Sequence, residues 1–272
     1  MYLIIASTIP ALLLLILITG RINLSFQFSR EVKELFAQSG NISGQTFRKS
    51  QLDNLPEPVQ RYFNHVLKDG QSYISYARIK HIGQFRPGFD KGWMNIKGEQ
   101  YATTEKPGFI WKGTTSMFVA RDMYIADKGR LVVSLFCLYN VADARGEEYD
   151  QGELLRWLGE SILYPTNLLP GQKLQWAAID SQTSKLTYNY HGLSLYFIVT
   201  FNETGEITEM VTKRYMDDKK IETWVIKSSD YQEMNYVLVP TTFDILWRLE
   251  KGDFSYARFN MTEIEYDKPE KF

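Results

Sequence analysis

The sequence predicts a mainly β protein: a large, curved, antiparallel sheet shaped like a half-barrel, with one or two packed helices and an N-terminal transmembrane helix. Three features support this fold class: an uncharged apolar start, a hydropathy period of two from about residue 73 onwards, and an aromatic content of 14%. Aromatic side chains are enriched in strands because they pack well on a pleated, half-buried surface. Without the apolar start about 250 residues remain, which one all-β domain can accommodate.

Residues 1–20 form the predicted membrane anchor. They read MYLIIASTIPALLLLILITG, and the first charged side chain is Arg21. About 20 apolar residues suffice to cross the hydrocarbon core of a bilayer as a helix. The alternative is a cleaved signal peptide, which would carry a basic start and a small-x-small cleavage site, and neither is present. We therefore expect a single-pass protein of the cell membrane.

The orientation of the anchor depends on few charges. The flanking basic residues, Arg21, Arg30 and Lys33, all follow the apolar run. The positive-inside rule therefore favours a cytoplasmic body. With so few charges, the side of the membrane on which the body lies stays open.

A polar connector, 21–54, is expected to join the anchor to a single β-rich domain, 55–272. The domain begins with a short helix over 56–67, where a proline occupies the first turn and apolar residues recur at helical spacing. A second helix is expected over 151–163, before Pro165. Alternating hydropathy predicts strands at 72–86, 92–104, 108–118, 119–126, 130–141, 173–180, 184–191, 193–201, 206–215, 221–231, 236–249 and 253–266.

Tight turns between long strands predict an antiparallel meander, in a sheet of nine or so strands, because parallel neighbours would need crossover helices. Two runs, 131–141 (LVVSLFCLYNV) and 193–201 (LSLYFIVTF), are apolar on both parities. This pattern is typical of strands that are covered on both faces. The available covers are the helices at 56–67 and 151–163, and we expect 151–163 to pack against the concave face.

Charged residues recur along one side of the second predicted helix. Glu153, Arg156 and Glu160 are spaced at i, i+3 and i+7. Such a stripe can be a solvated face with small ion-pair gains. If the helix plugs a concave sheet, the stripe instead lies in the mouth of a cavity, where Arg156 would need a partner because an unpaired buried charge is costly. Both interpretations stay open.

Several classes of function find no support in the sequence. The net charge of −1 provides no basic field for nucleic acid. Motifs such as GxGxxG, the Walker loop, GxSxG and HExxH are absent. The three histidines are far apart, and the only cysteine is Cys137. We therefore predict no catalytic constellation, no metal and no cofactor, and the sequence does not indicate an oligomeric state.

Many short motifs in a fixed order resemble an uncharacterised family of mainly bacterial, membrane-tethered proteins. The likeness spans roughly residues 55–266 and implies no established activity or substrate. The expected shape is also similar to that of half-barrel lipoprotein carriers, which hold acyl chains beside a helix, although fold does not imply function. The motifs are LPEPVQRYF at 55–63, G-x-F-R at 83–86, Trp93, Gln100, Pro107, Phe109, Trp111, Arg121-Asp122, Tyr124, Gly146-Glu147, Glu153–Arg156–Glu160, Pro165, Trp176, Arg214 and Pro240.

Three functions compete. The first is a membrane-anchored module that binds a lipid or another apolar ligand, with Arg86 or Arg156 meeting an anionic head group. The second is a structural or partner-binding protein of the cell envelope. The third is a hydrolase-type enzyme at the membrane, with Asp122, Glu160 and Arg121 as candidates. A large apolar cavity would favour the first function and a filled interior the second, whereas clustered acids with shifted pKa values in a cleft would favour the third.

For the binding module, the residues predicted to contact the ligand combine aromatic and charged side chains. They are Phe85, Arg86, Trp93, Phe109, Trp111, Tyr124, Arg156 and Glu160.

Overall fold

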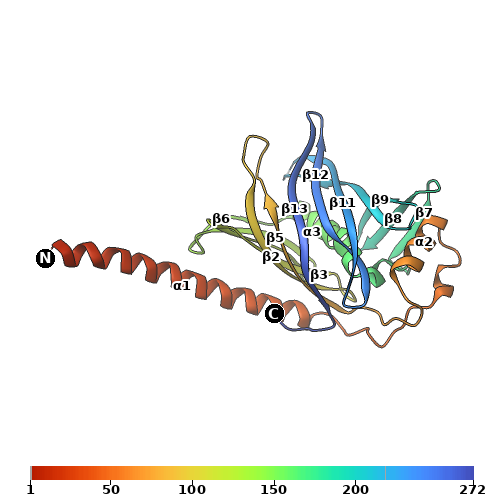
Figure 1. Ribbon diagram of the computed structural model, residues 1–272, viewed down its shortest axis with the longest axis horizontal. Helices are drawn as coiled ribbons and strands as arrows, with labels where there is room; N and C mark the ends of the chain where they lie inside the picture. The colour runs from red at the N-terminus through yellow and green to blue at the C-terminus, as the bar shows by residue number, and fades with distance from the viewer. Residues whose placement is uncertain (1, 218) are drawn as a thin grey trace.

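One antiparallel sheet dominates the computed structural model, which describes residues 2–217 and 219–272 (Figure 1). Within these residues the sheet has thirteen strands, in the order β6-β5-β4-β3-β2-β1-β13-β12-β11-β10-β9-β8-β7. The strands are β1 (Tyr76–Phe85), β2 (Met94–Thr103), β3 (Gly108–Thr114), β4 (Phe118–Ile125), β5 (Lys128–Leu135), β6 (Tyr139–Ala144), β7 (Leu174–Ala178), β8 (Thr183–Tyr190), β9 (Leu193–Phe201), β10 (Ile207–Tyr215), β11 (Ile221–Met234), β12 (Val237–Leu249) and β13 (Gly252–Tyr266). The sheet curves strongly but stays open, with β6 and β7 at its edges.

Two meanders make up the sheet, and one strand pair joins them. Strands β1 to β6 are neighbours in chain order, as are β7 to β13, and β1 pairs with β13 in the middle. The chain therefore leaves the sheet at one edge, β6, and re-enters it at the other, β7. The connecting segment spans the concave face and carries α3 (Glu147–Glu160), followed by the 3-10 turns Ser161–Leu163 and Pro165–Leu168.

Helix α3 lies inside the curve of the sheet (Figure 1) and supplies much of the core. Leu154, Leu155, Trp157 and Leu158 are buried there, and the Trp157 indole N–H donates to the carbonyl of Thr103 at 2.8 Å. The smaller helix α2 (Glu57–Val66), preceded by a 3-10 turn at Lys49–Leu52, packs against β8 and β12. The predicted curved antiparallel sheet with a packed helix is thus confirmed, and the helix begins earlier than expected, at Glu147.

Helix α1 (Tyr2–Ala37) is one continuous helix that projects from the body at its N-terminal end (Figure 1). The part over Ala11–Ala37 is long and apolar enough to cross a membrane, because a stretch of 18 residues within it has a mean hydropathy of 1.7, a property that signal sequences share. Its C-terminal half packs on the convex side of the sheet, where Phe28, Val32 and Leu35 form a second core. The sheet residues of this second core are Tyr76, Tyr101, Ile110, Met123 and Val132.

The sequence prediction was wrong on two details of the sheet. The strand number is thirteen rather than nine or so. The run 131–141 is not one strand, because Phe136 and Cys137 adopt positive φ angles of 51° and 64° and turn the chain between β5 and β6. An apolar run can hide such a turn, since neither glycine nor asparagine marks these two positions.

The elements that cover the two faces of the sheet also differ from those predicted. Strand β9 is fully buried only on one face, through Leu195 and Phe197, while Tyr196 and Ile198 on the other face are half-buried. Strand β5 is covered on both faces, with Val133 facing the concave side and Val132 packed in the second core. The outer cover is the C-terminal half of α1, and not the helix at 56–67, because α1 continues beyond residue 20 onto the sheet.

An ion pair fastens α1 to the sheet and generates a testable prediction. Arg121 of β4 is 1% exposed, and its Nη1 donates to Oε1 of Glu31 at 2.6 Å. Replacing Glu31→Ala leaves the guanidinium buried without its partner, so the free energy of unfolding should fall by about 3–5 kcal/mol. Denaturant titration of the full-length protein in detergent measures this loss.

The matched control is Glu34→Ala, three residues further along the same helix and exposed. It should change stability by no more than about 0.5 kcal/mol. Equal losses for the two variants would show that α1 is not held by the ion pair.

Candidate functional site

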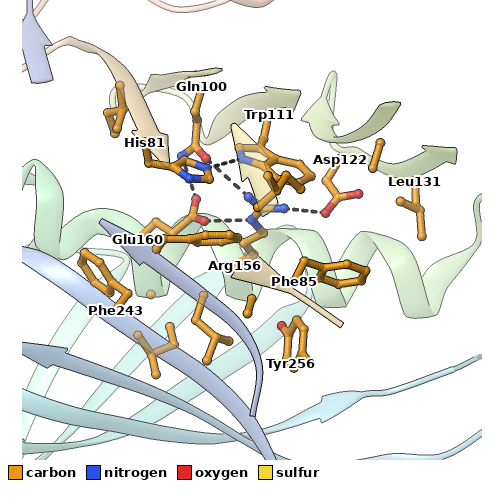
Figure 2. Close-up of a pocket in the computed structure, with 18 of the residues that line it drawn as sticks. His81, Phe85, Gln100, Trp111, Asp122, Leu131, Arg156, Glu160, Phe243 and Tyr256 are labelled. Carbon is orange, nitrogen blue, oxygen red and sulfur yellow. Dashed lines mark hydrogen bonds and ion pairs between the residues drawn. The ribbon is translucent and has the colours of Figure 1, made fainter. Parts of the chain in front are cut away.

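Between α3 and the concave face lies a cavity of about 380 Å³ (Figure 2). Strand side chains alternate between the two faces, so residues of one parity from both meanders line it. Small-molecule sites usually have volumes of about 300–1,000 Å³ and mostly apolar walls. The apolar and aromatic lining includes Ile79, Phe85, Ile96, Trp111, Phe118, Ala120, Leu131, Val133, Leu163, Trp224, Ile226, Phe243, Ile245, Tyr256, Phe259 and Met261.

Arg156 of α3 is the centre of a polar cluster on the cavity wall (Figure 2). Its Nη1 donates to Oδ2 of Asp122 at 2.5 Å, and its Nε donates to Oε1 of Glu160 at 2.8 Å. The guanidinium also lies over the rings of Trp111 and Phe109, 4.9 and 5.0 Å from their centroids. The partner that a buried Arg156 would require is therefore present, and two carboxylates and two rings hold it in place.

A second arginine, Arg214 of β10, forms hydrogen bonds to α3. It donates to the carbonyl of Gly152 at 3.0 Å and to Oε1 of Glu153 at 3.2 Å. Oε2 of Glu153 finds no hydrogen-bond partner among the residues that the structure describes. Burial, and then repulsion from Asp122, raises the pKa of Glu153 to about 8, and Arg214 offsets only part of this rise. Glu153 is therefore protonated at neutral pH.

The buried charges of the cluster balance. Burial raises the pKa of Asp122 as well, but the ion pair with Arg156 opposes this rise. With Glu153 protonated, the carboxylates of Asp122 and Glu160 face the guanidiniums of Arg156 and Arg214. The polar part of the cavity is then neutral as a whole, and Arg156 already has its counter-charges.

His81 of β1 extends the polar part of the cavity through Trp111. The Trp111 indole N–H donates to Nε2 of His81 at 2.8 Å, and the two rings are stacked. Burial, followed by the charge of Arg156, lowers the pKa of His81 to about 3, so the imidazole is neutral and can accept this hydrogen bond. Gly98 makes room for the ring, because a Cβ there would lie 1.8 Å from Nε2.

Residues 45–259 match the family of unknown function DUF6544. The chain belongs to this family. The family membership expected from the motifs at 55–266 is thus confirmed, and no curated protein matched the chain.

Two solved structures resemble the fold of this family member at 8% sequence identity. One is a LolA superfamily protein from Nitrosomonas europaea, with a TM-score of 0.43. The other, from Vibrio parahaemolyticus, is described as an outer membrane lipoprotein-sorting protein domain and has a TM-score of 0.42. Each match covers 78% of this chain and 92% of the other chain.

The structure brings four of the eight predicted ligand contacts to the cavity. Phe85, Trp111, Arg156 and Glu160 line it. Trp111 shares its strand face with Phe109, as the alternation predicts, but Phe109 is fully buried in the core beneath Arg156. Whether the four lining residues contact a ligand remains a prediction.

The other three predicted residues lie elsewhere. Tyr124 is buried in the core. Arg86 and Trp93 lie at the ends of the turn between β1 and β2, where the Trp93 ring is stacked by Arg86 at 4.7 Å and Arg258 at 4.6 Å. Arg86 also donates from Nε to the carbonyl of Ser255 at 2.6 Å, so it holds this hairpin against β13.

Four polar or charged residues of the site were missed as ligand contacts: His81, Gln100, Asp122 and Arg214. His81 shares its parity on β1 with Phe85, so the alternation of that strand could have pointed to it. Gln100 donates to Oε2 of Glu160 at 2.7 Å, across sixty residues of chain. No local signal predicts this contact, because it depends on where α3 crosses the sheet.

Metal chemistry finds no support in the site. Within residues 2–217 and 219–272, no group of three or more His, Cys, Asp or Glu side chains could hold a metal ion. The two acidic residues that line the cavity, Asp122 and Glu160, pair with Arg156 instead.

The protonated state of Glu153 predicts a pH dependence of stability. Its pKa is about 8 in the folded protein and ordinarily 4.5. The resulting stabilisation is complete below about pH 4.5 and is lost as the pH rises through about 8, by at most about 1.4 kcal/mol per pH unit. Glu153→Gln keeps the shape but cannot ionise, so its melting temperature should fall less between about pH 5 and about pH 8.

Thermal unfolding of both proteins in the same detergent checks this expectation. His81 titrates in both, so its contribution cancels in the comparison. An identical pH slope in the two proteins would mean that Glu153 is ionised in the fold.

Proposed function

We propose that this protein is a membrane-anchored binding module that takes up a lipid acyl chain or another apolar ligand in its cavity. The observation that carries the proposal is the cavity of about 380 Å³, lined mainly by apolar and aromatic side chains and enclosed by α3 (Figure 2). A well-filled interior would have favoured a purely structural protein, because a void in a core forfeits packing contacts. A bound apolar ligand would fill the cavity and restore these packing contacts.

Anchoring is the second part of the proposal. Helix α1 exposes Leu12, Leu13, Leu14 and Leu15, which a soluble body would not leave in water. Its apolar part is long enough to span a bilayer. A binding module anchored in this way would stay close to a source of acyl chains.

The polar cluster constrains the ligand's polar end. The expectation that Arg156 meets an anionic head group loses its basis, because Asp122 and Glu160 already pair with its guanidinium. A further negative charge would enter a buried cluster whose net charge is already zero, and this is costly. We therefore infer a ligand with an uncharged polar end.

A hydrolase-type enzyme is the second candidate. The observation that favours it is a pair of buried acids with raised pKa values: Asp122 lines the cavity, and Glu153 is bonded to the cavity residue Arg214. Shifted acids in a cleft are a mark of catalytic sites, but structural ion-pair networks shift pKa values as well. Both acids are bound to arginines here, so we place this candidate second.

Filling the cavity tests the binding proposal. Ala120 of β4 lines the cavity, and Ala120→Leu places three further carbon atoms in it. The fraction of protein that carries bound lipid should fall several-fold, while the melting temperature stays unchanged or rises because a void is filled. Native mass spectrometry of the full-length protein, released from detergent after purification from membranes, measures this fraction.

Val119→Leu is the matched control, because Val119 is the neighbouring residue on the same strand and faces the convex side. It should retain the lipid occupancy of the wild type. If the wild type itself carries no lipid mass, or if both variants retain it equally, the cavity is not the binding site.

The enzyme candidate has its own measurement. We expect the full-length protein to leave nitrophenyl acyl esters and glycosides unhydrolysed, because both acids are engaged by arginines. Hydrolysis that Asp122→Asn abolishes, with lipid occupancy unchanged, would move the enzyme ahead of the binding module.

A further inference from the structure

The turn between β5 and β6 presents an apolar patch to the surroundings. Phe136, Leu138, Tyr139 and Val141 are 50%, 48%, 71% and 55% exposed. Met117, from the β3–β4 turn, is also exposed and adjoins them, because the Phe136 N–H donates to its carbonyl at 2.8 Å. Residues 131–142 contain no charged side chain. We call Met117 and residues 136–141 the apolar tip.

The apolar tip meets α1 at Gly20. A Cβ on Gly20 would lie 2.5 Å from Cδ2 of Leu138 and 2.8 Å from the carbonyl oxygen of Cys137, so only glycine allows this approach. Figure 1 shows β6 on the side of the body from which α1 projects. Gly20 directly precedes Arg21, the first charged residue of the chain. The contact therefore lies at the level where the apolar part of α1 meets its polar part.

The apolar tip also adjoins the cavity. Phe118 and Val133 line the cavity, and Phe118 pairs with Leu135, the residue before Phe136. The exposed apolar surface thus continues from the cavity wall, along the ends of β4 and β5, to α1.

We propose that the apolar tip inserts into the lipid bilayer beside α1 and turns the adjacent wall of the cavity towards the membrane. The inference rests on the proposed anchoring by α1. A bilayer is the occupant that the geometry favours, because the tip is continuous with the exposed apolar surface of α1, which would lie in the same bilayer. Tyrosine side chains such as that of Tyr139 are enriched at the membrane interface, because the ring is apolar and the hydroxyl group can reach water.

The chain's single cysteine, Cys137, lies within the tip and allows a direct test. The full-length protein is labelled there with a nitrobenzoxadiazole fluorophore and reconstituted into phosphatidylcholine vesicles. Lipids that carry a doxyl quencher near the head-group end of the acyl chain should quench this label strongly. A label that stays as accessible to a water-soluble quencher as it is in detergent would overturn the inference.

The matched control places the label on another exposed hairpin. In Cys137→Ser with Tyr236→Cys, the label replaces a tyrosine that is 79% exposed at the β11–β12 turn. This turn lies at the opposite end of the strands, where Asn235 donates to the carbonyl of Ile264. Doxyl lipids should quench the label at Cys137 several-fold more than the label at 236, and equal quenching would overturn the inference.

A second variant keeps the apolar span and disturbs only the contact. Gly20→Leu forces the tip away from α1, because the new side chain meets the backbone of Cys137. Quenching of the Cys137 label should fall, while flotation of the protein with the vesicles stays unchanged. Flotation reports the anchor separately: protein that floats with an unquenched label contradicts only the tip, whereas protein that fails to float contradicts the anchor and the tip together.

Discussion

The pairing of β1 with β13 is the constraint on which the rest of the molecule depends. It joins two meanders by their inner strands, so the two edge strands, β6 and β7, lie at opposite ends of the sheet. The chain between these edges must cross the concave face, and α3 is the helix that crosses it. Because the sheet curves around this helix, both sides of α3 are enclosed, including the side that carries its charged residues.

The position of α3 explains the polar cluster. Charged side chains that a surface helix would present to water are here buried, and each needs a partner from the sheet. Asp122 of β4 and Arg214 of β10 supply these partners from the two meanders. Buried ion pairs of this kind stabilise a fold little compared with apolar packing. Their presence beside a cavity therefore favours a role in recognition over a role in stability, in line with the way binding sites place a few polar groups in apolar walls.

Helix α1 is continuous, so it joins the body rigidly to the exposed apolar part of the chain. Its exposed apolar part and its packed C-terminal half belong to the same helix, and Glu31 fixes that half to Arg121. A flexible connector would let the body rotate freely relative to the apolar part of α1. A continuous helix packed on the convex face instead fixes the orientation of the body relative to that part, with the tip of β5 and β6 beside Gly20. The packing of α1 on the sheet therefore fixes the position of the cavity relative to α1.

The sequence by itself determined the features that depend on local pattern: the apolar N-terminal helix, the alternating strands, their antiparallel order and the helix before Pro165. It also named Phe85 and Trp111 as residues that contact a ligand, and both line the cavity. The contacts of Arg156 with Asp122 and of Gln100 with Glu160 were beyond its reach, because strand pairing and the path of α3 bring together residues dozens of positions apart.

The run 131–141 shows the same limit most clearly. An apolar pattern on both parities fits a strand covered on two faces, and it fits equally a hairpin whose tip is exposed. Only the tertiary structure distinguished the covered strand from the exposed hairpin. The turn at Phe136 depends on positive φ angles that none of the residue types in the run predicts. The cover of the outer face was decided in the same way, by the packing of α1 on the convex side of the sheet.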